Sequence, residues 1–255
     1  MDRNVTTSRF SSIPWYKETR TITIGGAGTI GSWTAFLLMR SNDHNIEIVD
    51  DDKVESHNLA GQFFNVKDID AFKAEAVKNH IVAFNPDVTH LIYPSIARVD
   101  ESSEVNTICI SGFDNMKARA TMFDLWCKKE DREVFIDGRM AIETFEVFFV
   151  KKGEEEKYRK TLFDDSKLPD PICSLKSTSH TGAIIGSIIV GMLNNHLALV
   201  KDPDEFRRVP FHFTGDFPTF NFKIRKDEDN SVDTTIVKLE TVSESGVVLS
   251  ATSIP

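Results

Sequence analysis

Three glycines with the spacing of a phosphate-binding turn stand near the start of the chain. Gly26, Gly28 and Gly31 form G-x-G-x-x-G in "IGGAGTIGS", between an apolar stretch that predicts a buried strand and one that predicts a helix. Glycine permits a tight turn and a close phosphate, and the helix N-terminus supplies unpaired N–H groups and the positive end of its dipole. In this setting the motif predicts nucleotide binding, although a merely tight turn could use the same residues.

An acidic residue follows the glycines at the end of the next predicted strand. Asp50 comes about 20 residues after Gly31, the spacing at which an acid accepts hydrogen bonds from ribose hydroxyls. The triplet Asp50-Asp51-Asp52 could instead be a solvated turn. We expect Asp50 and Asp52 to face a nucleotide, and Asp51 to alternate away from it. Up to this point the pattern describes an NAD-dependent oxidoreductase equally well.

A second group of polar residues favours ATP over a nicotinamide. A protein that handles a triphosphate needs a lysine and a carboxylate for Mg²⁺, whereas hydride transfer needs neither. The chain offers Lys73 in "FKAEAVKNHIVAFNP" and Asp114 in "SGFDNMKARATMFDLWC". The oxidoreductase is therefore kept as a rival reading, but ATP is the predicted ligand.

The order of these motifs resembles that of the MoeB/ThiF family, which includes the adenylation domains of ubiquitin-activating enzymes. The family pattern is G-x-G-x-x-G, D-x-D-x-V with N-L-x-R-Q, a lysine ahead of "NP", and D-N-x-x-x-R. The likeness runs over about residues 21–120 and continues more weakly to the apolar stretch near 190. The matching residues are Gly26, Gly28, Gly31, Asp50, Asp52, Val54, Asn58, Leu59, Gln62, Lys73, Asn85, Pro86, Asp114, Asn115 and Arg119.

This resemblance implies that ATP activates a carboxylate, which attacks the α-phosphorus and gives an acyl adenylate and pyrophosphate. The implied substrate is the C-terminus of a small β-grasp protein, either ubiquitin-like or a sulfur carrier, or of a peptide. The resemblance also implies a role for each motif. Asp50 would hold the ribose, Asp52, Asn58 and Gln62 would line the nucleotide, Lys73 would neutralise phosphate charge, Asp114 would hold Mg²⁺, and Asn115 would cap nearby backbone or contact the nucleotide. Arg119 could take a direct role or form a salt bridge that holds the following helix.

Members of the family usually form homodimers in which an N-terminal arginine reaches the partner's nucleotide. Arg9 stands near the corresponding position, although the spacer to the first strand is shorter here. We therefore include Arg9 among the candidate catalytic residues. A basic residue on a loose arm is the simpler alternative.

The chain departs from the pattern at Gly61, which replaces the arginine of N-L-x-R-Q. Losing a cation that stabilises a phosphoryl-type transition state can lower the rate by about 10³–10⁵-fold. Either Arg9, Arg139 or Lys53 substitutes for it, or the chain is a nucleotide-binding pseudoenzyme that partners an active homologue. In the second case Gly61→Arg would restore activity. Ser111 likewise replaces the first acid of D-x-x-D-N.

The cysteines are sparse and form no C-x-x-C pair, so no structural zinc is expected. Cys173 resembles the position of the cysteine that forms a thioester or persulfide in some relatives, and a helix N-terminus nearby could activate it. An inert buried thiol is the alternative. Cys109 and Cys127 fall in a predicted strand and helix and are expected to be structural. His180 is expected to be a loop or capping residue.

The composition excludes some classes of partner. A net charge of -9 argues against general binding to nucleic acids or anionic membranes, both of which need a basic face. The N-terminus lacks the apolar core of a signal peptide, and the longest apolar run, 182–193, is too short to span a bilayer. We therefore expect a cytoplasmic protein, and read that run as part of a helix buried on all sides.

Apolar patterning predicts an α/β fold that can position these residues. Strands near 21–25, 45–49, 88–93, 107–111 and 133–137 alternate with helices near 30–40, 68–84 and 116–129, which predicts a Rossmann-like, mainly parallel sheet with helices on both faces. Antiparallel strands are expected in the C-terminal half, near 144–150, 210–215 and 219–225. The expected organisation is an N-terminal arm (1–20), one adenylation domain (21–225) with a mobile crossover at 151–180, and a C-terminal hairpin or tail (226–255).

Overall fold

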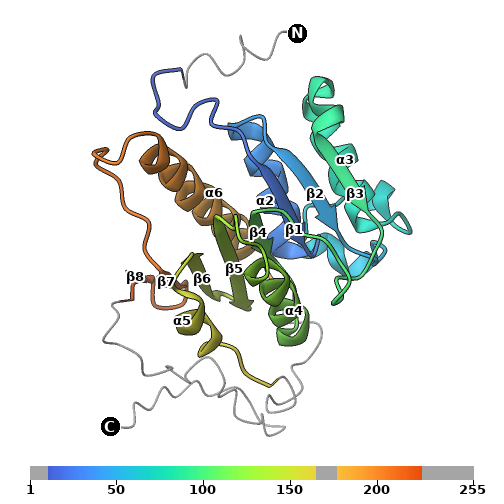
Figure 1. Ribbon diagram of the computed structural model, residues 1–255. Helices are drawn as coiled ribbons and strands as arrows, with labels where there is room; N and C mark the ends of the chain where they lie inside the picture. The colour runs from blue at the N-terminus through green and yellow to red at the C-terminus, as the bar shows by residue number, and fades with distance from the viewer. Residues whose placement is uncertain (1–10, 165–176, 226–255) are drawn as a thin grey trace, which may run out of the picture.

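A single mixed sheet organises the chain in the computed structural model, which describes residues 11–164 and 177–225 (Figure 1). Its eight strands lie in the order β3-β2-β1-β4-β5-β6-β7-β8. The strands are β1 (Thr21–Gly25), β2 (Asn45–Val49), β3 (Ile92–Ser95), β4 (Ile108–Ser111), β5 (Val134–Ala141), β6 (Thr144–Lys151), β7 (His212–Asp216) and β8 (Asn221–Ile224).

The N-terminal half of the sheet is parallel. β1 pairs with β2 on one side and β4 on the other, with Ile24 opposite Ile48 and Ile110, and β4 continues to β5. Because these strands are covered on both faces, they are nearly continuous runs of buried apolar residues. Parallel pairing brings the carboxyl ends of β1, β2 and β4 to one edge, which is where the predicted motifs lie.

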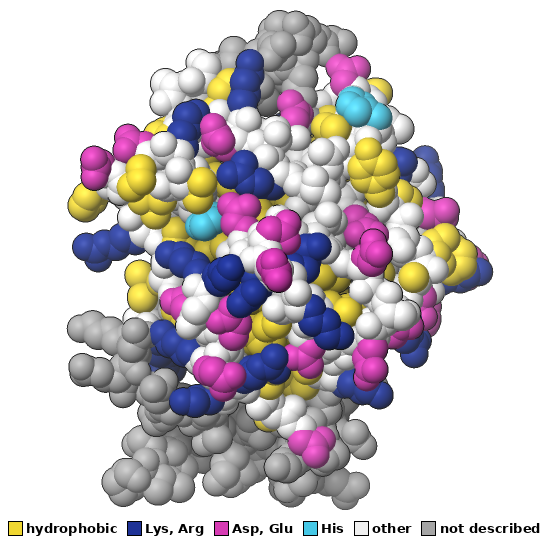
Figure 2. All heavy atoms as spheres, in the orientation of Figure 1, with side chains coloured by type: hydrophobic (Ala, Val, Ile, Leu, Met, Phe, Trp, Pro, Cys, Tyr) yellow, Lys and Arg dark blue, Asp and Glu magenta, His cyan; other side chains and the backbone are white. Residues whose placement is uncertain are grey.

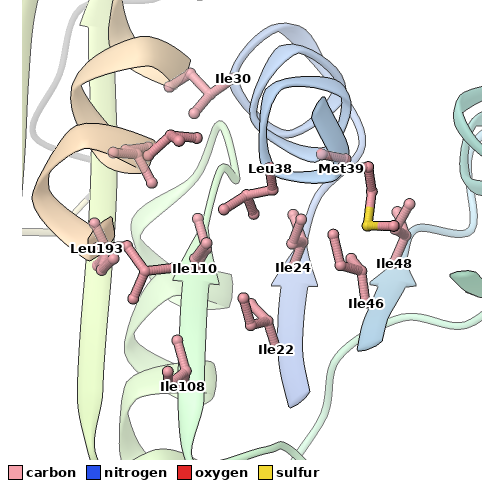
Figure 3. Packing of buried hydrophobic residues seen from close by; sticks show 14 of the residues in the cluster. Ile22, Ile24, Ile30, Leu38, Met39, Ile46, Ile48, Ile108, Ile110 and Leu193 are labelled. Atoms are coloured by element: carbon pink, nitrogen blue, oxygen red, sulfur yellow. The ribbon is translucent and has the colours of Figure 1, made fainter. Parts of the chain in front are cut away.

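Helices cover both faces of the sheet, as predicted. The helices are α2 (Thr29–Ser41), α3 (Lys73–Phe84), α4 (Met116–Cys127), α5 (Glu155–Arg159) and α6 (Ser179–Lys201), with short 3₁₀ turns η2 (Ser56–Ala60), η3 (Val66–Asp68) and η4 (Pro86–Leu91). One core cluster joins α2, α3 and α6 to the sheet, and a second joins α4 and α5 to the opposite face. Figure 3 shows the first core, where Leu38 and Met39 of α2 lie over the isoleucines of β1 and β2, which are Ile22, Ile24, Ile46 and Ile48.

The fifth strand begins the antiparallel half. β6 runs back along β5, and β7 and β8 extend the sheet in the same manner. In β6 the side chains of Phe145, Val147 and Phe149 belong to the core of α6, whereas Phe148 and Val150 pack toward α5. The antiparallel strand predicted near 144–150 is therefore present, and it is covered on both sides.

Several boundaries differ from the sequence prediction. Residues 88–91 belong to η4, so β3 starts at Ile92, and α3 starts at Lys73 rather than near 68. The charged stretch after β6 was predicted to be a mobile crossover, but it contains α5, which Tyr158 anchors in the core. The remainder of that crossover, 165–176, lies outside the described residues, as does the predicted hairpin or tail at 226–255.

The apolar run at 182–193 lies within α6, which has 23 residues. By length and composition such a helix could cross a membrane, but core helices of water-soluble folds pass the same test. α6 packs along α2, where added Cβ atoms at Gly182 and Gly186 would lie 2.4 Å from Thr29 Cγ2 and 3.1 Å from Thr34 N. The two glycines therefore set the close approach of the two helices (Figure 1).

Gly31→Ala is expected to destabilise the fold, because an added Cβ would lie 1.8 Å from the carbonyl oxygen of Gly26. We expect a loss of about 1–3 kcal/mol in the free energy of unfolding. Gly191→Ala is the matched control in α6, since nothing lies within 4 Å of its added Cβ. That variant should gain about 0.5–1 kcal/mol. Urea unfolding of both variants checks the prediction. An unchanged free energy of unfolding in Gly31→Ala would contradict it.

Candidate functional site

The glycine turn joins β1 to α2 at the carboxyl edge of the sheet. Gly26 has a φ of +84°, which L side chains rarely adopt, and its N–H donates to Val49 O at 2.9 Å. Gly112, after β4, donates to Gly25 O at 2.8 Å. β2 and β4 thus hold the turn from both sides, at the point where the order of the strands reverses. Such a crevice is the usual ligand site of an open parallel sheet.

Asp50 is built into this turn rather than standing free in solvent. One carboxylate oxygen accepts from Ala27 N at 2.6 Å and the other from Asp52 N at 2.8 Å. Burial raises the pKa of Asp50, while the Ala27 N–H and the Lys73 ammonium act in the opposite direction. The carboxylate therefore shapes the turn in the folded chain, in addition to any contact it makes with a ligand.

Lys73 is buried at the start of α3 rather than solvated on its surface. The side-chain Nζ of Lys73 lies 2.8 Å from Asp52 Oδ2, and the backbone N–H of Lys73 donates to Asp52 O at 2.9 Å. The lysine side chain is 10% exposed, whereas that of Asp52 is 61% exposed. Asp51 points elsewhere, with Oδ2 at 3.1 Å from Arg98 Nε. The predicted separation of Asp51 from Asp50 and Asp52 is therefore observed.

The segment that contains Asn58 and Gln62 lies against the first turns of α2. Trp33 Nε1 donates to Gly61 O at 3.3 Å, and Phe63 N donates to Ser32 Oγ at 3.0 Å. Asn58 is buried and accepts from Glu55 N at 2.8 Å, so it shapes η2. Gln62 Nε2 lies 3.9 Å from the position of an added Cβ on Gly28. Gln62 Oε1 is buried and has no hydrogen-bond partner among the described residues.

Gly61 is packed against the chain that enters α6. An added Cβ would lie 2.5 Å from Ser177 Oγ and 3.1 Å from Ser177 O. Ser177 also forms a parallel bridge with Ile142, after β5. The space that a side chain would need at residue 61 is therefore occupied, and the expectation that Gly61→Arg restores activity does not fit this packing.

The Asp114–Asn115 turn lies beside the glycine turn. A Cβ added to Gly26 would lie 3.1 Å from Gly112 C and 3.2 Å from Phe113 N. Asn115 caps α4 by accepting from Ala118 N at 2.8 Å, and its amide donates to Asp114 Oδ1 at 3.2 Å. Capping, one of the two roles expected for Asn115, is therefore observed. Asp114 is exposed, so its carboxylate is open to a ligand or metal ion.

A buried charged cluster supports this turn, and it was not predicted from the sequence. Asp137 in β5 is fully buried between Arg119 and Arg139, and it accepts from Tyr158 Oη at 2.9 Å. Arg119 also donates to Gly138 O at 2.8 Å and to Phe113 O. Burial alone would raise the pKa of Asp137, but the two arginines and Tyr158 hold it below the usual value. Arg119 therefore forms the structural salt bridge that was one of its two predicted roles.

The described candidates for the missing arginine are occupied by other contacts. Arg139 is buried, with Nε at 2.6 Å from Asp137 and its terminal nitrogens bonded to Thr161. Its guanidinium also stacks over Phe148. Lys53 Nζ lies over the ring of Phe72 at 5.1 Å. Arg9, the third candidate, lies outside the described residues.

The described cysteines are not activated thiols. Cys109 is buried in β4, where burial raises its pKa, and burial raises the pKa of Cys127 to about 11. Cys173 lies outside the described residues. His180 lies at the start of α6, with Nε2 at 3.2 Å from Glu143 Oε1. Within the described ranges there is no group of three or more His, Cys, Asp or Glu side chains that could hold a metal ion.

A ThiF family model matches residues 17–234. The chain belongs to the ThiF family. SAMP-activating enzyme E1 of Haloferax volcanii is 26% identical over 190 residues, which cover 72% of this chain and 68% of that protein. Ubiquitin-like modifier-activating enzyme 5 of Drosophila pseudoobscura pseudoobscura is 32% identical over 102 residues, which are 40% of this chain but only 23% of the fly protein.

The fold of this ThiF chain also resembles solved structures. The ATP complex of MccB from E. coli superposes with a TM-score of 0.59 at 14% identity, over 81% of this chain and 63% of MccB. A structure of PaaA gives a TM-score of 0.59 at 16% identity, over 88% of this chain and 66% of PaaA. The chain thus spans under two thirds of the MccB chain. At these identities the likeness concerns the fold, which is mixed α/β with parallel N-terminal and antiparallel C-terminal strands.

Gly61→Ala is expected to lower the free energy of unfolding by about 1–3 kcal/mol, because its Cβ would meet Ser177. Ser177→Gly removes the closest of the contacting atoms, so the double variant should recover part of this loss. Urea unfolding of the four proteins in the cycle measures the coupling. Additive losses would show that residues 61 and 177 are not packed together.

Acid is expected to destabilise the chain through Asp137. A carboxylate whose folded pKa lies below its unfolded value of 3.8 stabilises the fold above that value, and this contribution is lost as the pH falls through the folded pKa. Asp137→Asn should lower stability by about 3–5 kcal/mol at neutral pH, since Arg119 and Arg139 lose their shared partner. It should also flatten the loss of stability below about pH 4. Unfolding curves across pH test both effects, and equal acid sensitivity of the two proteins would contradict them.

Proposed function

We propose that the chain is an adenylyltransferase that uses ATP to activate the C-terminal carboxylate of a protein or peptide. The observation that carries this proposal is Lys73, which is buried against Asp52 beside the glycine turn. A buried cation at a phosphate-binding turn suits a triphosphate, because it can neutralise charge on the phosphate oxygens. Hydride transfer to a nicotinamide needs no such group, so this position supports ATP over the rival oxidoreductase.

In this proposal the glycine turn and the N-terminus of α2 hold the phosphates. Gly28 has open space on its exposed side, with Gln62 Nε2 as the nearest atom at 3.9 Å from an added Cβ. The buried Gln62 Oε1, which has no partner in the described part of the chain, is available to a nucleotide hydroxyl or amine. Asp50 accepts hydrogen bonds from the ribose.

Asp114 is the proposed Mg²⁺ ligand. Mg²⁺ commonly takes one or two carboxylates and completes its shell with water and substrate phosphates, so a single exposed carboxylate beside the turn fits its chemistry. The ion would neutralise charge on the phosphates of bound ATP. Asn115 and Arg119 keep the Asp114 turn in place through the α4 cap and the Phe113 carbonyl.

The substrate carboxylate would attack the α-phosphorus, forming the acyl–phosphate bond and releasing pyrophosphate. The relatives suggest the substrate class: one is named for activating SAMP, and a structure of MccB contains the peptide MccA with an ATP analogue. We extend this to a small β-grasp protein or a peptide, with a homodimer in the cytoplasm as the working assembly. Transfer to Cys173 as a thioester or persulfide remains a prediction, as does a role for Arg9.

A second function is supported by the packing at residue 61. Because Ser177 fills the space beside Gly61, and Arg139 and Lys53 are engaged elsewhere, none of these described cations is poised to replace the missing arginine. A chain that binds nucleotide but adenylates slowly would act as a partner subunit of an active homologue. ATP binding without pyrophosphate exchange distinguishes this alternative from the enzyme.

Lys73→Met and Asp114→Asn are expected to lower ATP–pyrophosphate exchange by at least about 100-fold, since each removes charge that stabilises the phosphates. Lys53→Met, which removes an exposed lysine stacked on Phe72, is the matched control and should retain activity.

Gly28→Ala should fold normally, because its Cβ meets only Gln62, yet bind ATP at least about tenfold more weakly. Exchange assays with candidate β-grasp proteins and peptides, alongside calorimetric ATP binding, measure these effects. Equal ATP affinity in Gly28→Ala would argue against this turn as the phosphate site.

A further inference from the structure

The carboxylate that supports the Asp114 turn comes from an unexpected strand. The D-x-x-D-N pattern has an acid at residue 111, where this chain has Ser111 at the end of β4. Ser111 is fully buried, and its hydroxyl has no hydrogen-bond partner among the described residues. A fully buried hydroxyl with no partner is costly, so the site is unusual for a serine.

Ser111 and Asp137 are direct neighbours in the sheet. They are paired residues in the parallel register of β4 and β5, so their side chains leave the sheet on the same face. This is the face covered by α4 and α5, since Cys109 and Phe135, the pair two residues earlier, belong to the core cluster of those helices. The face that lacks an acid at 111 therefore carries one at 137, in the adjacent strand.

Arg119 connects this acid to the turn. It reaches Asp137 and Gly138 in β5 with one nitrogen, and the carbonyl oxygen of Phe113 with the other. Phe113 directly precedes Asp114. The orientation of the Asp114 carboxylate thus depends on a guanidinium whose own position is fixed by Asp137. Arg139 and Tyr158 complete the contacts of Asp137 without touching the turn.

We propose that Asp137 is the positioning residue for the Asp114–Asn115 turn, and that through Arg119 it takes over the place of the acid missing at Ser111. Asp137 touches neither nucleotide nor substrate in this scheme. It holds Arg119, Arg119 holds the Phe113 carbonyl, and the turn presents Asp114. The inference deepens the proposed function and rests on it only where nucleotide affinity is the readout.

The first test moves the carboxylate from residue 137 to residue 111. Asp137→Ser should weaken binding of ATP with Mg²⁺ by about tenfold, the effect of losing one charged hydrogen-bonding partner. Ser111→Asp should lower the melting temperature in the wild-type background, because two carboxylates then share one site. The double variant Ser111→Asp/Asp137→Ser should bind ATP more tightly than Asp137→Ser alone. A double variant no better than Asp137→Ser would overturn the proposal.

Hydrogen exchange of the nucleotide-free chain provides a second test that does not depend on the proposed function. Arg119→Lys keeps a cation for Asp137 but cannot also donate to Phe113 O, so amides of residues 112–119 should exchange about tenfold faster. Tyr158→Phe is the matched control: it removes a hydrogen bond to Asp137 but leaves the turn contacts intact, so exchange at 112–119 should match that of the wild type. Equal exchange in Arg119→Lys and Tyr158→Phe would overturn the inference, even if the wild type shows no adenylation. Absence of adenylation together with faster exchange in Arg119→Lys would count against the proposed function alone.

Discussion

The close approach of three backbone segments at the carboxyl edge of the sheet is the constraint on which the site depends. The turn after β1, the start of α2 and the loop after β4 meet at Gly26, Gly31 and Gly112, where none of the three positions has room for a Cβ without displacing backbone. This contact brings the glycine turn and the Asp114 turn together although they are far apart in sequence. It also explains why polar residues gather here, since every strand that ends at this edge leaves peptide groups that need partners.

The charges around this contact are arranged in pairs rather than as a field of one sign. Asp52 neutralises Lys73, and Asp137 lies between Arg119 and Arg139, so each buried charge has a partner. On the face shown in Figure 2, acidic and basic side chains are interspersed in the same way. The pairing lowers the cost of these buried charges, because a charge that is taken out of water without a partner is strongly destabilising.

Much of this arrangement could be predicted from the sequence, for identifiable reasons. The parallel half of the sheet was predicted from apolar runs that alternate with segments of helical periodicity. The positions of Asp50, Lys73 and Asp114 near the glycine turn were predicted from sequence motifs with a characteristic order and spacing. The boundary errors arose where apolar residues continue past a strand, as in the 3₁₀ turn before Ile92. The Asp137 cluster could not be predicted, because it depends on which residues face each other across β4 and β5. The only signal in the sequence was an acid and an arginine two residues apart inside an apolar strand, Asp137 and Arg139.

Gly61 shows how a single departure from a motif acquires its meaning from the fold. In the sequence it is a missing cation, and the natural inference is a loss of catalytic power. In the structure it is the position at which the entry to α6 rests on the segment between η2 and α3, with Trp33 bonded to the same peptide. Absence of a side chain is what permits that contact, so the glycine has a structural role that an arginine could not share. Under the proposed function, the question of activity therefore shifts from residue 61 to the group that would stabilise the phosphates of ATP in its place, and a cation from a second subunit is the kind of group that would suffice.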